Sequence, residues 1–218
     1  MTKLSKLMPS MANILGLEEK SIRVIAMHLR RNGLISSGGR GRGGADMTRQ
    51  DVTNLLLGVI GANNAIDAPK VVDQARNCQL DMVVIDGKKA WTEDGTVEGL
   101  EGAANFPFWT DGKLNIPLDF LFDNDKKPLT AGELIDWLFE TLSSGRLGPF
   151  FKNGEGRRLM PLHLEILRPG KSVILHCLDD GDDYQCFYHN NNISYDRYDL
   201  VARLGISRIR EIASLISE

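Results

Sequence analysis

Two glycines divide the first 35 residues into segments whose apolar residues recur with a helical period. Gly16 follows a segment that begins at Pro9, and Gly33 follows a longer one that begins at Glu19. Glycine adopts the left-handed conformation that ends helices at little steric cost. The sequence therefore predicts helices at 9–15 and 19–32, joined by a short turn that packs them at a steep angle.

Small and apolar residues around this turn have the spacing of a helix-turn-helix. The set comprises Ala12 at the crossing, Gly16 in the turn, and Ile22 and Ile25 as anchors on the second helix. Through these residues, and through the run LRRNGLI at 29–35, residues 4–48 resemble winged helix-turn-helix DNA-binding proteins of bacteria and phages. The resemblance implies that the second helix enters the major groove of duplex DNA.

The resemblance also implies which side chains contact DNA. Lys20 and Arg23 would reach base edges, with Glu19, Ser21, Val24 and Met27 on the same face, and later arginines would bind phosphates. The predicted DNA-binding residues are Lys20, Ser21, Arg23, Met27, Arg30, Arg31, Arg40, Arg42 and Arg49. The alternative is that these helices only pack into a core.

A wing is predicted after the second helix. Residues 34–36 are expected to form a short strand, and the segment 37–44 (SGGRGRGG) is too rich in glycine for regular structure. Arg40 and Arg42 would approach the minor groove from this segment. A solvent-exposed loop without DNA contact is the alternative.

Charge is distributed unevenly along the chain. Residues 1–50 contain nine Lys or Arg and three Asp or Glu, a net of +6, whereas the whole chain of 218 residues carries −3. A basic module attached to an acidic body suits a partner that is a polyanion. A solvated basic surface without a ligand is the alternative.

The remainder predicts an α+β fold with further helices and an antiparallel meander. Helices are expected at 49–61, 67–77, 130–142, 198–203 and 207–217, and strands at 114–122, 159–167, 172–177 and 184–189. Glycine and turn residues at 86–112 indicate a linker or a long excursion. The expected division is a DNA-binding domain at 1–80, a linker or excursion at 81–112 and an assembly or sensing domain at 113–218.

No pattern in the chain argues strongly for catalysis, a metal or a cofactor. A zinc site from His176, Cys177, Cys186 and His189 lacks the usual knuckle spacing, and the glycines at 39–44 lack a surrounding strand-turn-helix unit. A Cys–His dyad stays open because such residues meet in space and not in sequence. We expect no enzyme activity, no metal and no cofactor.

These features together favour a sequence-specific, duplex DNA-binding transcriptional regulator that acts as a homodimer or a higher oligomer. The apolar helix at 49–61, followed by the helix at 67–77, is the candidate dimerisation element, or else both helices complete the N-terminal core. Sparse cysteines and the lack of a long apolar run predict a cytoplasmic protein without membrane contact. The alternatives are a phage-type DNA-packaging or assembly component, a protein-interaction module and a nucleic-acid enzyme.

Overall fold

The structure, a computed structural model, combines helices with antiparallel strands, which confirms the α+β class. It describes residues 2–37, 46–85, 88–92, 109–110, 113–114, 130–144, 162–167, 172–179, 182–189 and 201–217. The helices are α1 (Leu4–Leu15), α2 (Glu19–Arg31), α3 (Arg49–Gly61), α4 (Ala68–Arg76), α6 (Ala131–Ser143) and α7 (Ile206–Ser217). The strands are β1 (Gln79–Ile85), β2 (Lys88–Thr92), β3 (Trp109–Thr110), β4 (Lys113–Leu114), β5 (Leu162–Leu167), β6 (Ser172–Asp179), β7 (Asp182–His189) and β8 (Val201–Gly205).

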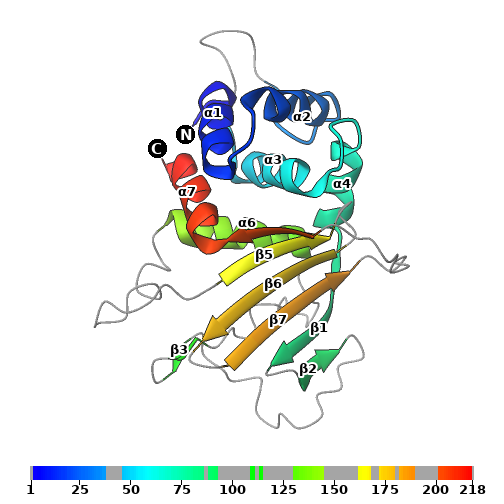
Figure 1. The fold of residues 1–218 in the computed structure, drawn as a ribbon, viewed down its shortest axis with the longest axis vertical. Coiled ribbons are helices and arrows are strands. Elements are labelled where there is room, and N and C mark those ends of the chain that lie inside the picture. The colour runs from blue at the N-terminus through cyan, green and yellow to red at the C-terminus, as the bar shows by residue number, and fades with distance from the viewer. Residues whose placement is uncertain are drawn as a thin grey trace.

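The main sheet has six strands in the order β2-β1-β7-β6-β5-β8, and every neighbouring pair is antiparallel. The predicted meander is confirmed as β5-β6-β7. β3 and β4 form a separate short hairpin. In Figure 1 the helices gather at the end of the molecule next to the β8-β5 edge, and β1 runs from the end of α4 to the far end, where β2 lies.

One hydrophobic core joins the helices to the sheet. Its fully buried side chains include Leu7 of α1, Leu55 of α3, Phe139 of α6 and Ile166 of β5. The division expected at residue 80 therefore does not separate two cores. Residues 81–85 of the expected linker or excursion belong to β1, which pairs with β7 and with β2. Residues 93–108 lie outside the described part of the chain.

The first helix is longer than the sequence indicated. α1 begins at Leu4, and Pro9 lies inside it rather than at its first position. Leu7 and Met11, both fully buried, extend the apolar face across the proline. This burial offsets the loss of the backbone hydrogen bond that a proline cannot donate.

The helix expected at 198–203 is wrong, because residues 201–205 form β8. Pairing with β5 buries Leu204 and places Arg203 opposite Glu165, whose carboxylate accepts from the Arg203 guanidinium at 2.6 Å. Contacts with a distant strand thus override the local pattern. Of the strand expected at 114–122, the structure describes only Leu114, in β4.

The expected dimerisation helix is an internal element. Every residue of α3 from Asp51 to Gly61 is buried within the single chain, against α2, α4 and α6. α3 therefore has no free apolar face for a second copy, and the alternative that it completes the core is confirmed.

Candidate nucleic-acid interface

The α1–turn–α2 unit has the backbone geometry that its two glycines predict. Gly16 and Gly33 adopt φ of 68° and 70°, in the left-handed region. Beyond Gly16, the Leu17 N–H donates to the Ala12 carbonyl at 2.9 Å, and beyond Gly33 the Leu34 N–H donates to the Leu29 carbonyl at 3.0 Å. These bonds satisfy carbonyls at both helix ends and fix the direction in which the chain leaves each helix.

One face of α2 is anchored in the core. Ile22, Ala26 and Leu29 are buried there, and α2 packs against α1, α3 and α4. The close approach to α3 depends on Gly58, because a Cβ at that position would lie 3.1 Å from Leu29 Cδ1 and 3.2 Å from Ile25 Cγ2. A larger residue at 58 would displace α2, so this glycine sets the depth at which the helix sits.

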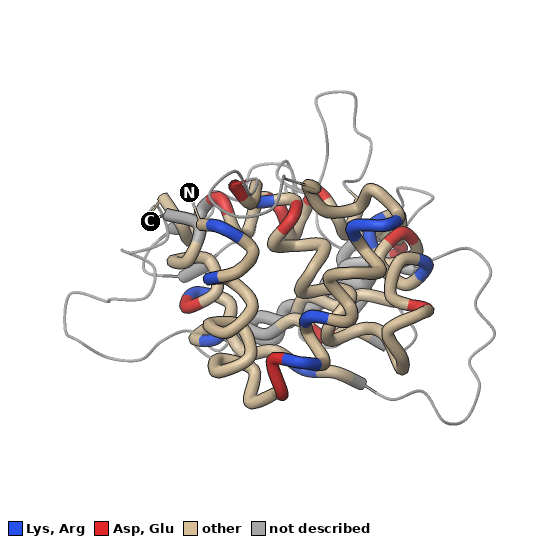
Figure 2. Tube along the Cα trace, turned by 90° about the horizontal axis from the view of Figure 1, so that it is seen from above, with Lys and Arg blue, Asp and Glu red and all other residues tan. Residues whose placement is uncertain are grey.

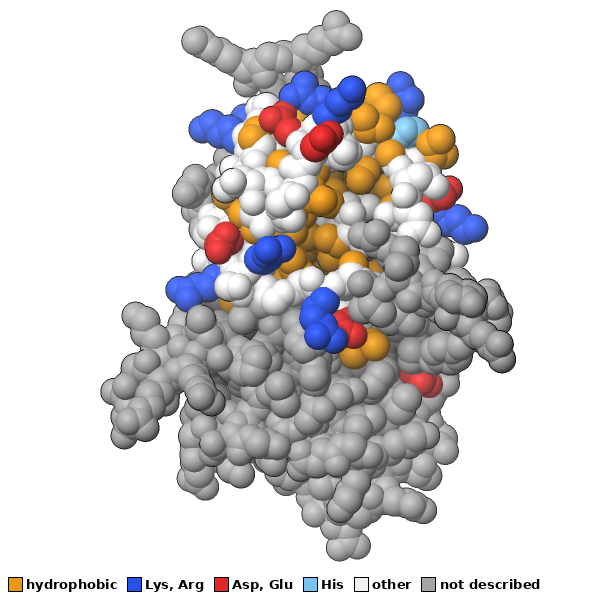
Figure 3. All heavy atoms as spheres, viewed as in Figure 1, with side chains coloured by type: hydrophobic (Ala, Val, Ile, Leu, Met, Phe, Trp, Pro, Cys, Tyr) orange, Lys and Arg blue, Asp and Glu red, His pale blue; other side chains and the backbone are white. Residues whose placement is uncertain are grey.

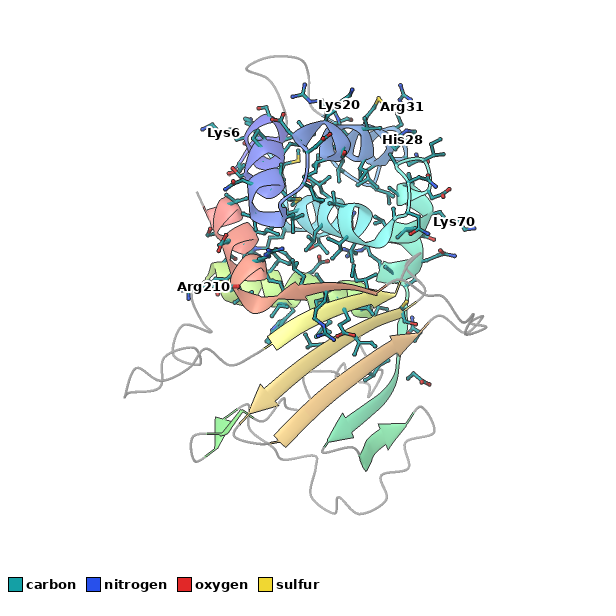
Figure 4. The ribbon with its side chains drawn as sticks, in the orientation of Figure 1. Lys6, Lys20, His28, Arg31, Lys70 and Arg210 are labelled. Atoms are coloured by element: carbon teal, nitrogen blue, oxygen red, sulfur yellow. The ribbon has the colours of Figure 1, made fainter. Side chains whose placement is uncertain are left out.

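The opposite face of α2 is exposed and carries the predicted DNA-contact residues of this helix. Those with exposed side chains are Lys20, Ser21, Arg23, Met27, Arg30 and Arg31. Figure 4 shows Lys20 and Arg31 projecting from α2 away from the rest of the molecule. In Figure 3, basic, acidic and hydrophobic side chains share this end of the surface.

Arg23 has an ion-pair partner within its own helix. Its guanidinium donates to the Glu19 carboxylate, one helical turn earlier, at 2.5 Å. An exposed pair of this kind contributes well under about 1 kcal/mol. A phosphate or a guanine edge can therefore replace Glu19 as its partner at little cost.

The predicted DNA-contact residues do not all share one surface. Arg49 begins α3, and its guanidinium lies 3.5 Å from Glu140 of α6, on the side of α3 away from α2 (Figure 1). Arg40 and Arg42 lie outside the described residues. The exposed face of α2 is thus the part of the predicted interface that the structure places together.

The strand expected at 34–36 is not formed, because side chains of α3 bind its backbone groups. Asn54 Nδ2 donates to the Leu34 carbonyl at 2.6 Å, and the Ser36 N–H donates to Asp51 Oδ1 at 2.7 Å. No neighbouring strand pairs with this segment in the described part of the chain. The strand component of the predicted wing is therefore wrong.

Asp51 binds the segments on both sides of residues 37–47. Its carboxylate also accepts from Ser36 Oγ at 2.9 Å and from the Thr48 N–H at 2.8 Å, while Thr48 Oγ1 caps α3 by accepting from the Asp51 N–H. Asp51 is only 5% exposed. No pattern in the sequence predicted this link between two chain segments.

A polar network continues from α3 to α4 and α6. Arg76 donates to Asn54 Oδ1 at 3.0 Å and to the Asp136 carboxylate at 2.5 Å. A Cβ at Gly132 would lie 3.0 Å from the Arg76 carbonyl oxygen, so glycine permits this approach of α6 to α4. Leu34, three residues beyond the end of α2, is thereby connected through Asn54 and Arg76 to α6.

Charges elsewhere on the described surface are mixed in sign. Figure 2 shows Lys and Arg interspersed with Asp and Glu along the helices rather than separated into two poles. Lys6 of α1, Lys70 of α4 and Arg210 of α7 project in directions different from the exposed face of α2 (Figure 4). The basic character of this end therefore centres on α2.

Metal and thiol chemistry find little support among the described residues. No cluster of three or more His, Cys, Asp or Glu suited to a metal ion occurs among them. Burial raises the pKa of the Cys78 thiol to about 12, so it stays protonated and unreactive near neutral pH. The side chains of His176, Cys177, Cys186 and His189 lie outside the described part.

Two further observations bear on what the chain is. None of the described helices has both the length and the apolar character needed to cross a membrane. Comparisons with protein-family models, with curated proteins and with solved structures find no match to this chain.

Proposed function

We propose that this protein binds duplex DNA through the exposed face of α2 and acts as a sequence-specific regulator of transcription. The observation that carries the proposal is the asymmetry of α2 in its helix-turn-helix setting. Its buried face fixes the helix on α1 and α3, while its exposed face presents Lys20, Arg23, Arg30 and Arg31 to solvent.

The dimensions and charge of this helix suit a major groove. A B-DNA major groove is about 12 Å wide and admits one α-helix. The anchored face holds α2 rigidly, so the entropy cost of ordering it on DNA is already met by folding. Cations on this exposed face that contact phosphates would release counterions, which makes binding sensitive to salt.

A single short helix buries little surface, so specific affinity calls for two copies on a repeated half-site. Because α3 is buried, the contact between copies must use another element. A two-fold arrangement would then set the spacing of the half-sites at about one helical turn of DNA or a multiple of it. Light scattering of the free protein and of the complex measures the number of copies.

The proposal is tested by selecting tightly bound sequences from a pool of randomised duplexes. We expect a defined consensus for the wild-type protein and a relaxed consensus for Arg23→Ala. Removing a base contact lowers the discrimination between the preferred base and the others by about 10-fold or more. Lys70→Ala removes one positive charge from α4 and serves as the matched control, with its consensus unchanged. Recovery of unselected sequence by the wild-type protein would argue against specific recognition.

A further inference from the structure

Four residues form a straight stripe along the exposed face of α2. Lys20, Val24, Met27 and Arg31 recur at intervals of four, three and four. At about 100° per residue, their side chains fall within a sector of about 60°, opposite the buried Ile22 and Leu29. The stripe therefore has a cation at each end and two apolar side chains in its centre.

The apolar centre is unusual for the described surface. The exposed large hydrophobic residues among the described ones are Leu17 (45%), Val24 (38%), Met27 (39%) and Ile66 (75%). Only Ile66 lies away from α2 and the turn that precedes it. Apolar area thus gathers on the one face that also carries the cations of α2.

We propose that Val24 and Met27 recognise the 5-methyl groups of thymines on neighbouring A·T base pairs, while Lys20 and Arg31 contact phosphates on either side. This inference rests on the proposed duplex binding. Thymine presents a methyl group in the major groove, whereas cytosine presents an amino donor that an aliphatic side chain cannot accept. Burial of a methyl group against Val or Met therefore discriminates between the two bases.

The spacing of the stripe agrees with this assignment. Residues three apart on a helix are separated by about 4.5 Å along its axis, close to the rise of about 3.4 Å between successive base pairs. The terminal cations are separated by about 16 Å along the axis. This length places them beyond the two central base pairs, where the phosphates of the groove walls lie.

The charges argue against a second copy of α2 as the occupant of this face. An antiparallel two-fold contact between two such stripes would bring Lys20 of one copy towards Arg31 of the other. Like charges held opposite each other at an interface disfavour that pairing. A polyanion with apolar groups between its charges complements the stripe, and a thymine-containing duplex has this chemistry.

The test uses the full-length protein and the best duplex from the selection, with thymines replaced singly by deoxyuridine, which lacks only the methyl group. At the two positions under α2, wild-type affinity should fall about fourfold for each methyl removed. In Val24→Ala with Met27→Ala, the ratio of thymine to uracil affinity should fall to about one. Ile66→Ala, which truncates an exposed residue elsewhere, should keep the wild-type ratio.

The outcomes separate this inference from the function on which it rests. Duplex binding that is indifferent to uracil, or a ratio that persists in the double variant, overturns methyl recognition and leaves duplex binding intact. Absence of binding to every duplex at low salt overturns both. If the double variant abolishes self-association of the free protein in light scattering, the stripe is a protein contact and the inference is wrong.

Discussion

α2 and α3 have the same length and pack against each other, yet they face opposite environments. Each has 13 residues; α3 buries every residue from Asp51 to Gly61, whereas α2 buries Ile22, Ala26 and Leu29. The polar residues Asp51 and Asn54 of α3 bind backbone groups of the 34–36 segment. Most polar residues of α2 reach solvent. The difference indicates that α3 stabilises the fold, whereas the exposed face of α2 is accessible to a partner.

Truncation within α3 should have the largest effect on stability. Leu55 is fully buried, so Leu55→Ala should lower the free energy of unfolding by about 2–5 kcal/mol through lost contacts and a cavity. Met27→Ala on the exposed face of α2 should change it by under about 0.5 kcal/mol. Urea unfolding followed by circular dichroism measures both. Equal losses would show that the two helices do not differ as the burial indicates.

Loss of the Asp51 carboxylate should have the second-largest effect on stability. Asp51→Ala removes the acceptor of two backbone N–H groups and one hydroxyl, and hydrogen bonds to a charged group contribute about 1.5–3 kcal/mol each before relaxation. We expect a net destabilisation of about 2–3 kcal/mol, measured by the same unfolding experiment. Asp46→Ala, which removes an exposed carboxylate paired with Lys3, is the control, and its effect should be under about 1 kcal/mol. If Asp51→Ala lost no more free energy of unfolding than Asp46→Ala, the link through Asp51 would be contradicted.

A methyl group at position 58 tests how closely the two helices must pack. Gly58→Ala gains helix propensity of about 0.5–1 kcal/mol but crowds Leu29 and Ile25 at a cost of about 1–3 kcal/mol. The expected net result is a loss of about 1 kcal/mol, together with weaker duplex binding because α2 shifts outward. Thermal unfolding and a binding titration measure the two effects. A stabilised variant with unchanged binding would show that the close approach is not required.

The effect of burial on chemical reactivity, rather than on stability, is tested at Cys78. Burial raises the pKa of its thiol from 9.0 to about 12, so the fold favours the neutral form and loses stability only as pH rises through that range. Alkylation at pH 7 should therefore be slower at Cys78 than at a free thiol by about a thousandfold, the difference in thiolate fraction. Mass spectrometry of peptides after timed alkylation measures this rate. Fast modification of the folded protein at Cys78 would contradict its burial.

Elements with local signals were predictable from the sequence. The glycines at 16 and 33, the helices expected at 49–61 and 130–142 and the alternating strands of the meander act through neighbouring residues, and these elements are confirmed. β1 and β8 were missed because each is a strand through its pairing with a distant one. The beginning of α1 was missed because burial of Leu7 and Met11 outweighs the proline between them.

The candidate site was likewise predictable only where the signal lies in neighbouring residues. Helical periodicity was enough to separate the exposed face of α2 from its buried face. The contacts of Asp51 with Ser36 and of Arg76 with Asp136 span 15 and 60 residues, and no pattern along the chain marks such pairs. Their partners are fixed only when the helices pack.

The most direct test of the proposed interface compares two variants of equal charge in a salt titration on one labelled duplex. Lys20→Ala with Arg31→Ala removes two cations from α2, and Lys70→Ala with Arg210→Ala removes two from elsewhere on the surface. If α2 is the interface, the slope of log affinity against log salt should decrease by about 1.8 for the first variant and stay unchanged for the second. Equal slopes in both variants, or no binding by the wild-type protein at low salt, would contradict duplex recognition by α2.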